Sequence, residues 1–174
     1  MAAIFDAIRA AYPAPDSDGQ PAGAPPVQCL GVSHGVLVLA LEPAALLATA
    51  QRLRDTFGFD LFLDVTAVDW PGHPLRFEVV HHLMATQHKV RVRLKTRVAE
   101  ADPVVDSLTG LYGAAGYQER ECHDMYGIVF RGNPDLRPIL LYEGFVGHPL
   151  RKDYPKQQEQ PLVPYRPPQS ALVR

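Results

Sequence analysis

A run of charged residues in the last third of the sequence has the residue types needed for acid–base chemistry. Glu121 and Asp124 are three positions apart on a predicted helix, so their carboxylates lie on neighbouring faces. Two carboxylates in close proximity can serve as a general acid and a general base. They can also accept ion pairs from the basic residues that follow, which are Arg137, Arg151 and Lys152. Because this helix carries three acids and three bases follow it, we favour structural pairing over catalysis.

The predicted helix that carries these acids runs from about Tyr117 to Tyr126 and ends at Gly127. Arg120 and Asp124 are four residues apart, a spacing that allows an ion pair along one helix face. The charged residues of this helix that we expect at a subunit interface are Glu119, Arg120, Glu121 and Asp124.

No regular element of any length is predicted after residues 128–130. Residues 131–174, here called the C-terminal strap, are rich in charge and in turn-forming residues, and Pro134, Pro138 and Pro149 fix φ and remove donors. An ordered segment without a strand ladder must satisfy its backbone groups elsewhere, and a partner chain is the natural supplier. The strap residues that we expect at the interface are Asp135, Arg137, His148, Arg151, Lys152 and Asp153.

Other sites are disfavoured by spacing. Adjacent strand residues point to opposite faces, so His81 and His82 cannot easily share a metal ion, and no CxxC or HxxxH pair is present. Neighbours on a helix diverge by roughly 100°, which argues against Cys122 and His123 as a nucleophile–base pair. We therefore predict no metal site and no catalytic residue.

A basic row alternates along the predicted strand 89–98 and could contact phosphates. Its members are Lys89, Arg91, Arg93, Lys95 and Arg97. Nucleic-acid binding would call for further basic clusters, which the sequence lacks, and the net charge is −2. Neither GxxxxGK[ST] nor GxGxxG occurs between a strand and a helix. A solvated or partner-facing strand is the favoured interpretation. At the edge of a sheet, such a row would also discourage aggregation.

Hydrophobic periodicity predicts the elements that position these residues. The predicted helices are 3–11, 44–57 with Gly58 as its cap, 102–111 and 117–126. The predicted strands are 27–32 and 36–41, joined as a hairpin, followed by 61–68, 75–83 and 89–98. Residues 13–26 contain five prolines and two glycines, and this composition predicts a loop or linker.

This order of elements is typical of an α+β fold. We expect a two-layer domain with a mixed, largely antiparallel sheet, helices on one face, and an extended C-terminal strap. The domain is predicted to cover residues 1–130 and the strap residues 131–174.

The overall composition favours an intracellular chain with one domain. The 174 residues are enough for a core without a covalent staple, and the two cysteines, Cys29 and Cys122, lie far apart. The N-terminus has no basic region followed by an apolar run, and no stretch approaches the ~20 apolar residues of a membrane span.

The charged helix and the strap also carry a sequence resemblance. Residues 119–155 resemble the signature of the 30-kDa subunit of NADH–quinone oxidoreductase (respiratory complex I). The matching positions are Glu119 to Glu121, Asp124 to Ile128, Phe130, Gly132, Pro134 to Arg137, Ile139-Leu140, Gly144-Phe145 and Gly147 to Pro155. A weaker match covers Leu63 to Val65, Val68-Asp69 and Arg76 to Val80. Three positions depart from the pattern, where Trp, His and Arg are usual: Tyr117, Asn133 and Pro138.

The resemblance implies a non-catalytic subunit of the peripheral arm that has no cofactor of its own. FMN, the iron–sulfur clusters and quinone would be bound by partner subunits. The implied partners are the quinone-site (49-kDa-type) subunit and neighbouring iron–sulfur subunits, at the cytoplasmic face of the inner membrane. The chain would support electron transfer from NADH to quinone coupled to ion translocation.

Two other functions stay open at this point. Related assemblies, such as membrane-bound hydrogenases, carry similar subunits. A stand-alone hydrolase would use Glu121 and Asp124 as its acid–base pair.

Overall fold

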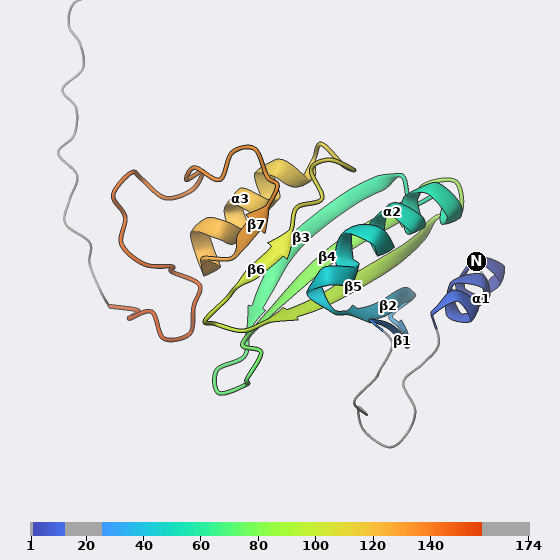
Figure 1. Cartoon of the computed structure of the whole chain (residues 1–174), viewed down its shortest axis with the longest axis horizontal. Helices are drawn as coiled ribbons and strands as arrows, with labels where there is room; N and C mark the ends of the chain where they lie inside the picture. Colours follow the sequence, from blue (N-terminus) through green and yellow to red (C-terminus); the bar gives the residue numbers. More distant parts are fainter. Residues whose placement is uncertain (1, 13–25, 158–174) are drawn as a thin grey trace, which may run out of the picture.

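A five-stranded sheet forms the centre of the molecule, in the computed structural model that describes residues 2–12 and 26–157 (Figure 1). Its strand order is β1-β2-β5-β4-β3. The strands are β1 (Val27–Ser33), β2 (Val36–Leu41), β3 (Leu61–Asp69), β4 (Phe77–Ala85) and β5 (Val90–Val98). β2 and β5 are parallel and the other neighbours are antiparallel. The predicted α+β class with a mixed, largely antiparallel sheet is therefore confirmed.

Three α-helices accompany the sheet in the described part of the chain. They are α1 (Ala2–Ala11), α2 (Leu46–Phe57), which follows the short η1 turn (Pro43–Ala45), and α3 (Ala115–Tyr126). α2 crosses one face of the sheet, and α3 lies along its β3 side (Figure 1). As predicted, α2 and α3 end at Gly58 and Gly127, both of which adopt the left-handed conformation that glycine tolerates best.

The core fills the space between one face of the sheet and the helices. Leu39, Leu94 and Leu83 point inward from the strands, and Leu46 and Leu53 meet them from α2. All five are fully buried. Alternation along each strand sends the intervening polar residues to the opposite face, where no helix of the described residues lies.

Side chains of α3 cover the free edge of β3. The amide of Gln118 donates to the carbonyl of Leu63 (3.2 Å) and accepts from the backbone N–H of Val65 (2.9 Å), as a neighbouring strand would. The Cys122 thiol donates to the Val65 carbonyl at 3.4 Å. These contacts fix α3, and therefore its charged residues, against the sheet.

The helix predicted for residues 102–111 is wrong. The structure has β6 (Val104–Asp106), which pairs in parallel with β7 (Val129–Arg131). Two adjacent β-branched residues favour the strand, and the Ser107 hydroxyl and the Leu108 N–H are held outside any helix by the Glu119 carboxylate. Asp102 and Pro103 resembled a helix start, but long-range contacts decided the conformation.

The basic row on β5 lies in the middle of the sheet, because β5 pairs with β2 on one side and with β4 on the other. It therefore does not protect a sheet edge. The predicted boundary between domain and strap falls at β7, and residues 132–157 contain no helix or strand. Most of the predicted linker (13–25) and the end of the strap (158–174) lie outside the described residues.

Candidate functional site

The described part of the strap, residues 132–157, runs beside α3 and returns toward the end of β3 (Figure 1). Its contacts with the domain come from side chains and turns, not from a strand ladder. Three groups of contacts hold it: one along α3, one at the C-terminal end of α3, and one around Arg76.

Asp124 anchors the middle of the strap. Its Oδ2 accepts hydrogen bonds from three successive backbone N–H groups, those of residues 139, 140 and 141, at 2.8, 2.9 and 3.3 Å. Burial disfavours the charged carboxylate, but these three donors outweigh it and lower the pKa of Asp124 below its usual value. Asp124 therefore stays ionised and is occupied by the strap.

Arg120 also binds the strap through its backbone. Its guanidinium donates to the carbonyls of Arg137 (2.8 Å) and Pro138 (2.9 Å). The predicted ion pair between Arg120 and Asp124 is absent from the described residues, because each of the two side chains takes backbone partners in the strap instead. Arg137 forms a local bidentate pair with Asp135, both bonds at 2.8 Å, and remains exposed.

Glu119 is fully buried beneath the start of the strap. It accepts from the Ser107 hydroxyl (2.7 Å), the Leu108 N–H (2.8 Å) and the side-chain amide of Asn133 (2.8 Å). Burial raises the pKa of Glu119 despite these donors. Asn133 stands where the resembled signature usually has His, and here it ties the strap to this buried acid.

The last carbonyls of α3 are capped by the strap. The His148 Nδ1–H donates to the carbonyl of Asp124 (2.8 Å), the Leu150 N–H to Met125 (3.1 Å) and the Arg151 Nε–H to Tyr126 (2.7 Å). These carbonyls have no partner within the helix, and a positive charge is favourable at this end of the helix dipole.

Gly127 makes that capping possible. It has φ +74°, and a Cβ at this position would lie 2.6 Å from Nη2 of Arg151. A side chain here would therefore be strained and would displace Arg151. The positive φ belongs to the local end of α3, whereas the close approach of Arg151 follows from the packing of the strap.

Arg76 is the centre of the third group, and the sequence pattern alone did not single it out. Its guanidinium forms a bidentate pair with buried Asp69 (2.7 and 2.9 Å) and reaches Glu100 (2.7 Å) and Asp153 (2.8 Å). The backbone N–H of Lys152 donates to Asp69 at 2.7 Å. The signal that could have identified this group was the weaker family match at Asp69 and Arg76.

Two arginines that lie against the same aromatic ring complete this group. The guanidinium groups of Arg76 and Arg151 lie 5.1 and 4.8 Å from the ring centroid of Phe77. Arg151 thus joins the cap on α3 to the Arg76 cluster. This part of the strap is therefore fixed to α3 at one end and to β3 at the other.

The predicted pairing between the acids of the helix and Arg137, Arg151 and Lys152 is therefore replaced by other partners. Glu121 is exposed, and no ion pair or hydrogen bond involves it in the described part of the chain. It does not form an acid–base pair with Asp124, whose carboxylate is occupied. The expectation that these residues lie at a subunit interface stays a prediction.

The strap exposes several large apolar side chains among its charged ones, which the sequence reasoning missed. Leu140 and Val146 are 59% and 70% exposed. The other exposed large apolar side chains of this surface are Ile139, Tyr142 and Leu150. The sequence did contain a signal for these side chains, because apolar residues lie between the charged residues along the strap.

Within residues 2–12 and 26–157, no group of three His, Cys, Asp or Glu side chains is placed to hold a metal ion. His81 is fully buried on the inner face, where burial lowers its pKa to about 3, and His82 lies on the outer face. No helix of the described part is long and apolar enough to cross a membrane.

Comparison with proteins of known sequence identifies similar chains. An NADH-quinone oxidoreductase subunit of Methylobacterium sp. (strain 4-46) is 46% identical over 126 residues, which cover 71% of this chain and 58% of that protein. The protein of the same name from Sinorhizobium medicae is 47% identical over 126 residues, covering 71% and 62%. The chain thus spans about three fifths of the length of these relatives.

Two solved structures are similar in fold. A trypsin-resistant fragment (1-134) of Nqo5 is 30% identical with a TM-score of 0.55, covering 64% of this chain and 89% of the fragment. A chain of the membrane-bound sulfane sulfur reductase, an archaeal respiratory membrane complex, is 25% identical with a TM-score of 0.68, covering 77% and 80%.

A family model completes the comparison. The model described as respiratory-chain NADH dehydrogenase, 30 Kd subunit, matches residues 39–160, which include α2, α3, the strands from β3 to β7 and the described strap. That match covers well over half of the sequence. The chain therefore belongs to the family of the 30 Kd subunit of respiratory-chain NADH dehydrogenase.

Proposed function

We propose that this chain is a structural subunit of the peripheral arm of NADH-quinone oxidoreductase, at the cytoplasmic face of the inner membrane. In this role it supports electron transfer from NADH to quinone coupled to ion translocation. It holds no cofactor and supplies no catalytic residue; FMN, the iron–sulfur clusters and quinone belong to partner subunits. Family membership and the names of the relatives support this proposal.

The observation that carries the proposal is that the polar and the apolar side chains of the strap have different roles. Several of its charged and polar groups hold it to its own domain, through contacts with Asp124, with the end of α3 and within the Arg76 cluster. Its apolar side chains are left outside. A surface that exposes several large apolar side chains on a fixed backbone is typical of a binding surface.

The strap surface is accordingly the site at which the quinone-site (49-kDa-type) subunit and the neighbouring iron–sulfur subunits dock. Leu140 and Val146 are the central apolar contacts. Arg137 and Lys152 of the same segment are exposed and can add polar contacts. The anchoring residues act indirectly, because they fix the backbone that presents the apolar side chains.

The hydrolase alternative has no support in this geometry. Glu121 points to solvent and Asp124 accepts three backbone hydrogen bonds, so the two carboxylates do not share a substrate-sized site. A general base must be free to take a proton from a substrate.

A related respiratory assembly is the second candidate. The likeness to a chain of the archaeal sulfane sulfur reductase supports the same structural role with a different electron donor. In that case the strap would still dock on a partner subunit, and only the composition of the recovered complex would differ.

Affinity purification of the tagged chain from its native membranes in mild detergent tests the proposal. We expect the flavin and iron–sulfur subunits to co-purify with NADH:quinone activity. The variant carrying Leu140→Asp and Val146→Asp should lose these subunits. Leu47→Asp, at a leucine on α2 that is also exposed (39%), is the control and should keep them.

Each possible result is informative. Full recovery of the complex with both strap substitutions would overturn the strap surface as the docking site. Recovery of the wild-type chain with a hydrogenase or sulfur reductase would favour the second candidate. A lone chain without partners would contradict both candidates.

A further inference from the structure

The face of the sheet that carries no helix has the opposite construction to the strap surface. Its side chains include the basic row of β5, and Arg91, Arg93, Lys95 and Arg97 all point to this side. The carboxylates that face them from β4 and β3 are Glu78 and Asp64. Among the described strands, four cations therefore share this face with two carboxylates, although the chain as a whole has a net charge of −2. A third carboxylate, Glu42, directly follows β2.

The two carboxylates do not neutralise the row evenly. Glu78 is nearly buried and binds Lys95 (2.7 Å) and Arg97 (2.8 Å). Arg93 uses only its Nε–H, which donates to His82 Nε2 at 2.8 Å. Within residues 2–12 and 26–157, no carboxylate lies within ion-pair distance of Arg91 or Arg93. The guanidinium fork of each is thus available for a carboxylate.

The positive charges on this face affect the pKa of His82, which lies on the same face. Burial lowers the pKa of His82, and the positive charges of Arg93 and Arg91 lower it further, while Asp64 opposes them. His82 is therefore neutral at pH 7, as its role as acceptor from Arg93 requires. An added negative charge would relieve this unbalanced field.

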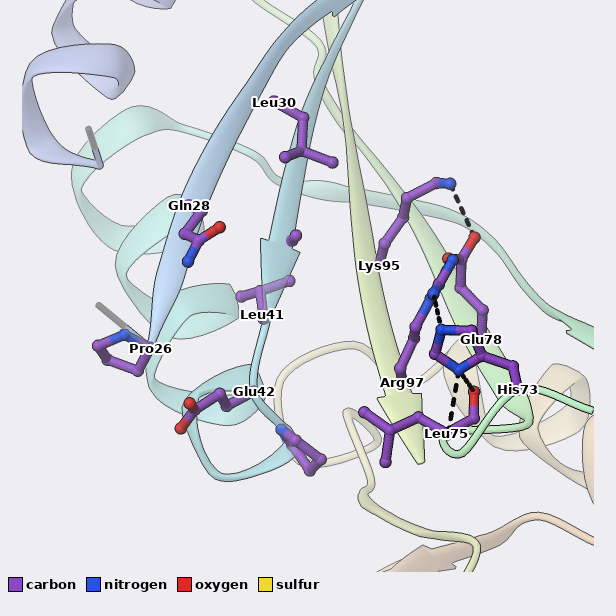
Figure 2. Close-up of a pocket in the computed structure, with 12 residues that line it drawn as sticks. Pro26, Gln28, Leu30, Leu41, Glu42, His73, Leu75, Glu78, Lys95 and Arg97 are labelled. Carbon is purple, nitrogen blue, oxygen red and sulfur yellow. Dashed lines mark hydrogen bonds and ion pairs between the residues drawn. The ribbon is translucent and has the colours of Figure 1, made fainter. Parts of the chain in front are cut away.

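A cleft lies at one end of the row (Figure 2). It has a volume of about 450 Å³ and is lined by Leu30, Leu75, Lys95 and Arg97, among other residues. Figure 2 shows Leu30 and Leu75 on opposite sides of it, with Lys95 and Arg97 between them reaching toward Glu78. Both leucines are about half exposed. The cleft combines an aliphatic wall with two basic side chains that are paired with Glu78, and Glu42 also lines it.

The spacing of the row matches an extended chain. Every second residue of a strand lies on the same face, about 6.6 Å from the next. A partner segment in extended conformation has the same repeat along its own side chains. Acidic residues at alternate positions could therefore meet Arg91, Arg93 and Lys95 in register, whereas a helix would present them at a different spacing.

We propose that the helix-free face of the sheet is a second docking surface, which binds an extended acidic segment of another subunit. Arg91 and Arg93 bind its carboxylates, and the cleft between Leu30 and Leu75 takes an aliphatic side chain of the same segment. The inference rests on the proposed function only in that another subunit is required. The net negative charge of the chain speaks against an anionic lipid surface or a nucleic acid as the occupant.

Arginine-specific labelling of the intact complex and of the isolated full chain tests the proposal. With phenylglyoxal as the probe and peptide mass spectrometry as the readout, we expect Arg91 and Arg93 to react about tenfold less in the complex. Arg9 on α1 serves as the reference. Equal labelling of Arg91 and Arg93 in both samples, with the other subunits still co-purifying, overturns this surface and leaves the proposed function intact.

Carbodiimide cross-linking of the complex then identifies the occupant. The Lys95 amine should form an amide with an Asp or Glu of another subunit, and Arg91→Glu with Arg93→Glu should remove that product. Arg91→Lys with Arg93→Lys is the matched control, which keeps the charge and should keep the product. Cross-links only to Glu78 or to a second copy of this chain, or protection of the arginines by anionic vesicles alone, contradict the proposal.

Discussion

The strap surface and the helix-free face of the sheet distribute charge in opposite ways. Along the strap, nearly every charged group that is buried has a partner within the chain, and the apolar side chains face outward. On the sheet, Val38 and Val80 are sheltered by long basic side chains, and the arginines retain free donors. Charged groups can therefore hold a segment in place when their partners lie within the chain, whereas charged groups without such partners can be the part that binds.

The comparison also separates anchoring from docking. Asp124 and Arg151, which stand out in the sequence, fix the strap to its own domain. Their substitution should first affect the stability of the isolated chain. Substitution of outward groups should affect the complex alone.

Arg76→Met tests the anchoring side of this comparison with the largest expected effect. It leaves the buried carboxylate of Asp69 without its bidentate partner, which costs about 3 to 5 kcal/mol for a broken buried pair. Urea unfolding of the isolated chain measures the loss. Adding Asp69→Asn should restore part of it, because no buried charge then remains. No loss with Arg76→Met alone would show that the cluster does not stabilise the strap.

Asp124→Ala should destabilise the isolated chain by about 2 to 3 kcal/mol, because three backbone N–H groups lose a charged acceptor. Glu121→Ala, three residues earlier on the same helix, is the matched control and should change the free energy of unfolding by less than about 0.5 kcal/mol. Equal effects of the two substitutions in chemical denaturation would contradict the assignment of Asp124 as an anchor.

Gly127→Ala should cost about 1 to 2 kcal/mol from its positive φ, and more from displacement of Arg151. Gly113→Ala provides the comparison, since no atom lies within 4 Å of a Cβ there and its φ is not in the positive range. Thermal unfolding of both variants measures the difference. A Gly127→Ala protein as stable as Gly113→Ala would argue against the cap on α3.

Acid should release the strap before it unfolds the sheet. The hydrogen bond from Arg76 lowers the pKa of Asp69, and the three backbone donors lower that of Asp124 against the opposing effect of burial. Both carboxyls therefore contribute stability that is present above their unfolded pKa of about 3.9 and is lost as pH falls below it. Hydrogen exchange of residues 139–141 between pH 5 and 3 measures this, and Asp124→Asn should weaken the dependence.

The smallest effects are expected for exposed charges. Arg137→Ala breaks only a local pair with Asp135, so the melting temperature of the isolated chain should not change measurably.

Arg91→Gln with Arg93→Gln should likewise leave the free energy of unfolding of the isolated chain within about 0.5 kcal/mol of wild type. Loss of stability in the Arg91 and Arg93 variant would mean that the basic row holds the sheet together, which would remove the contrast with the strap.

Local sequence signals determined much of this fold. Alternation placed the strands of the sheet within a few residues, and the glycines at 58 and 127 marked the ends of α2 and α3. These features depend on neighbours in sequence, so a local pattern is sufficient to predict them. The helix predicted for residues 102–111 failed because the decisive partners, Glu119 and β7, lie far along the chain.

The sequence by itself determined the family, the α+β class and the positions of the charged residues that matter. Only the tertiary structure decided what each charge binds. Helix geometry favoured an Arg120–Asp124 pair, but folding of the strap offered backbone carbonyls to one and three N–H groups to the other. Backbone groups of an irregular segment must find partners when they are buried, and this requirement outweighed the local ion pair.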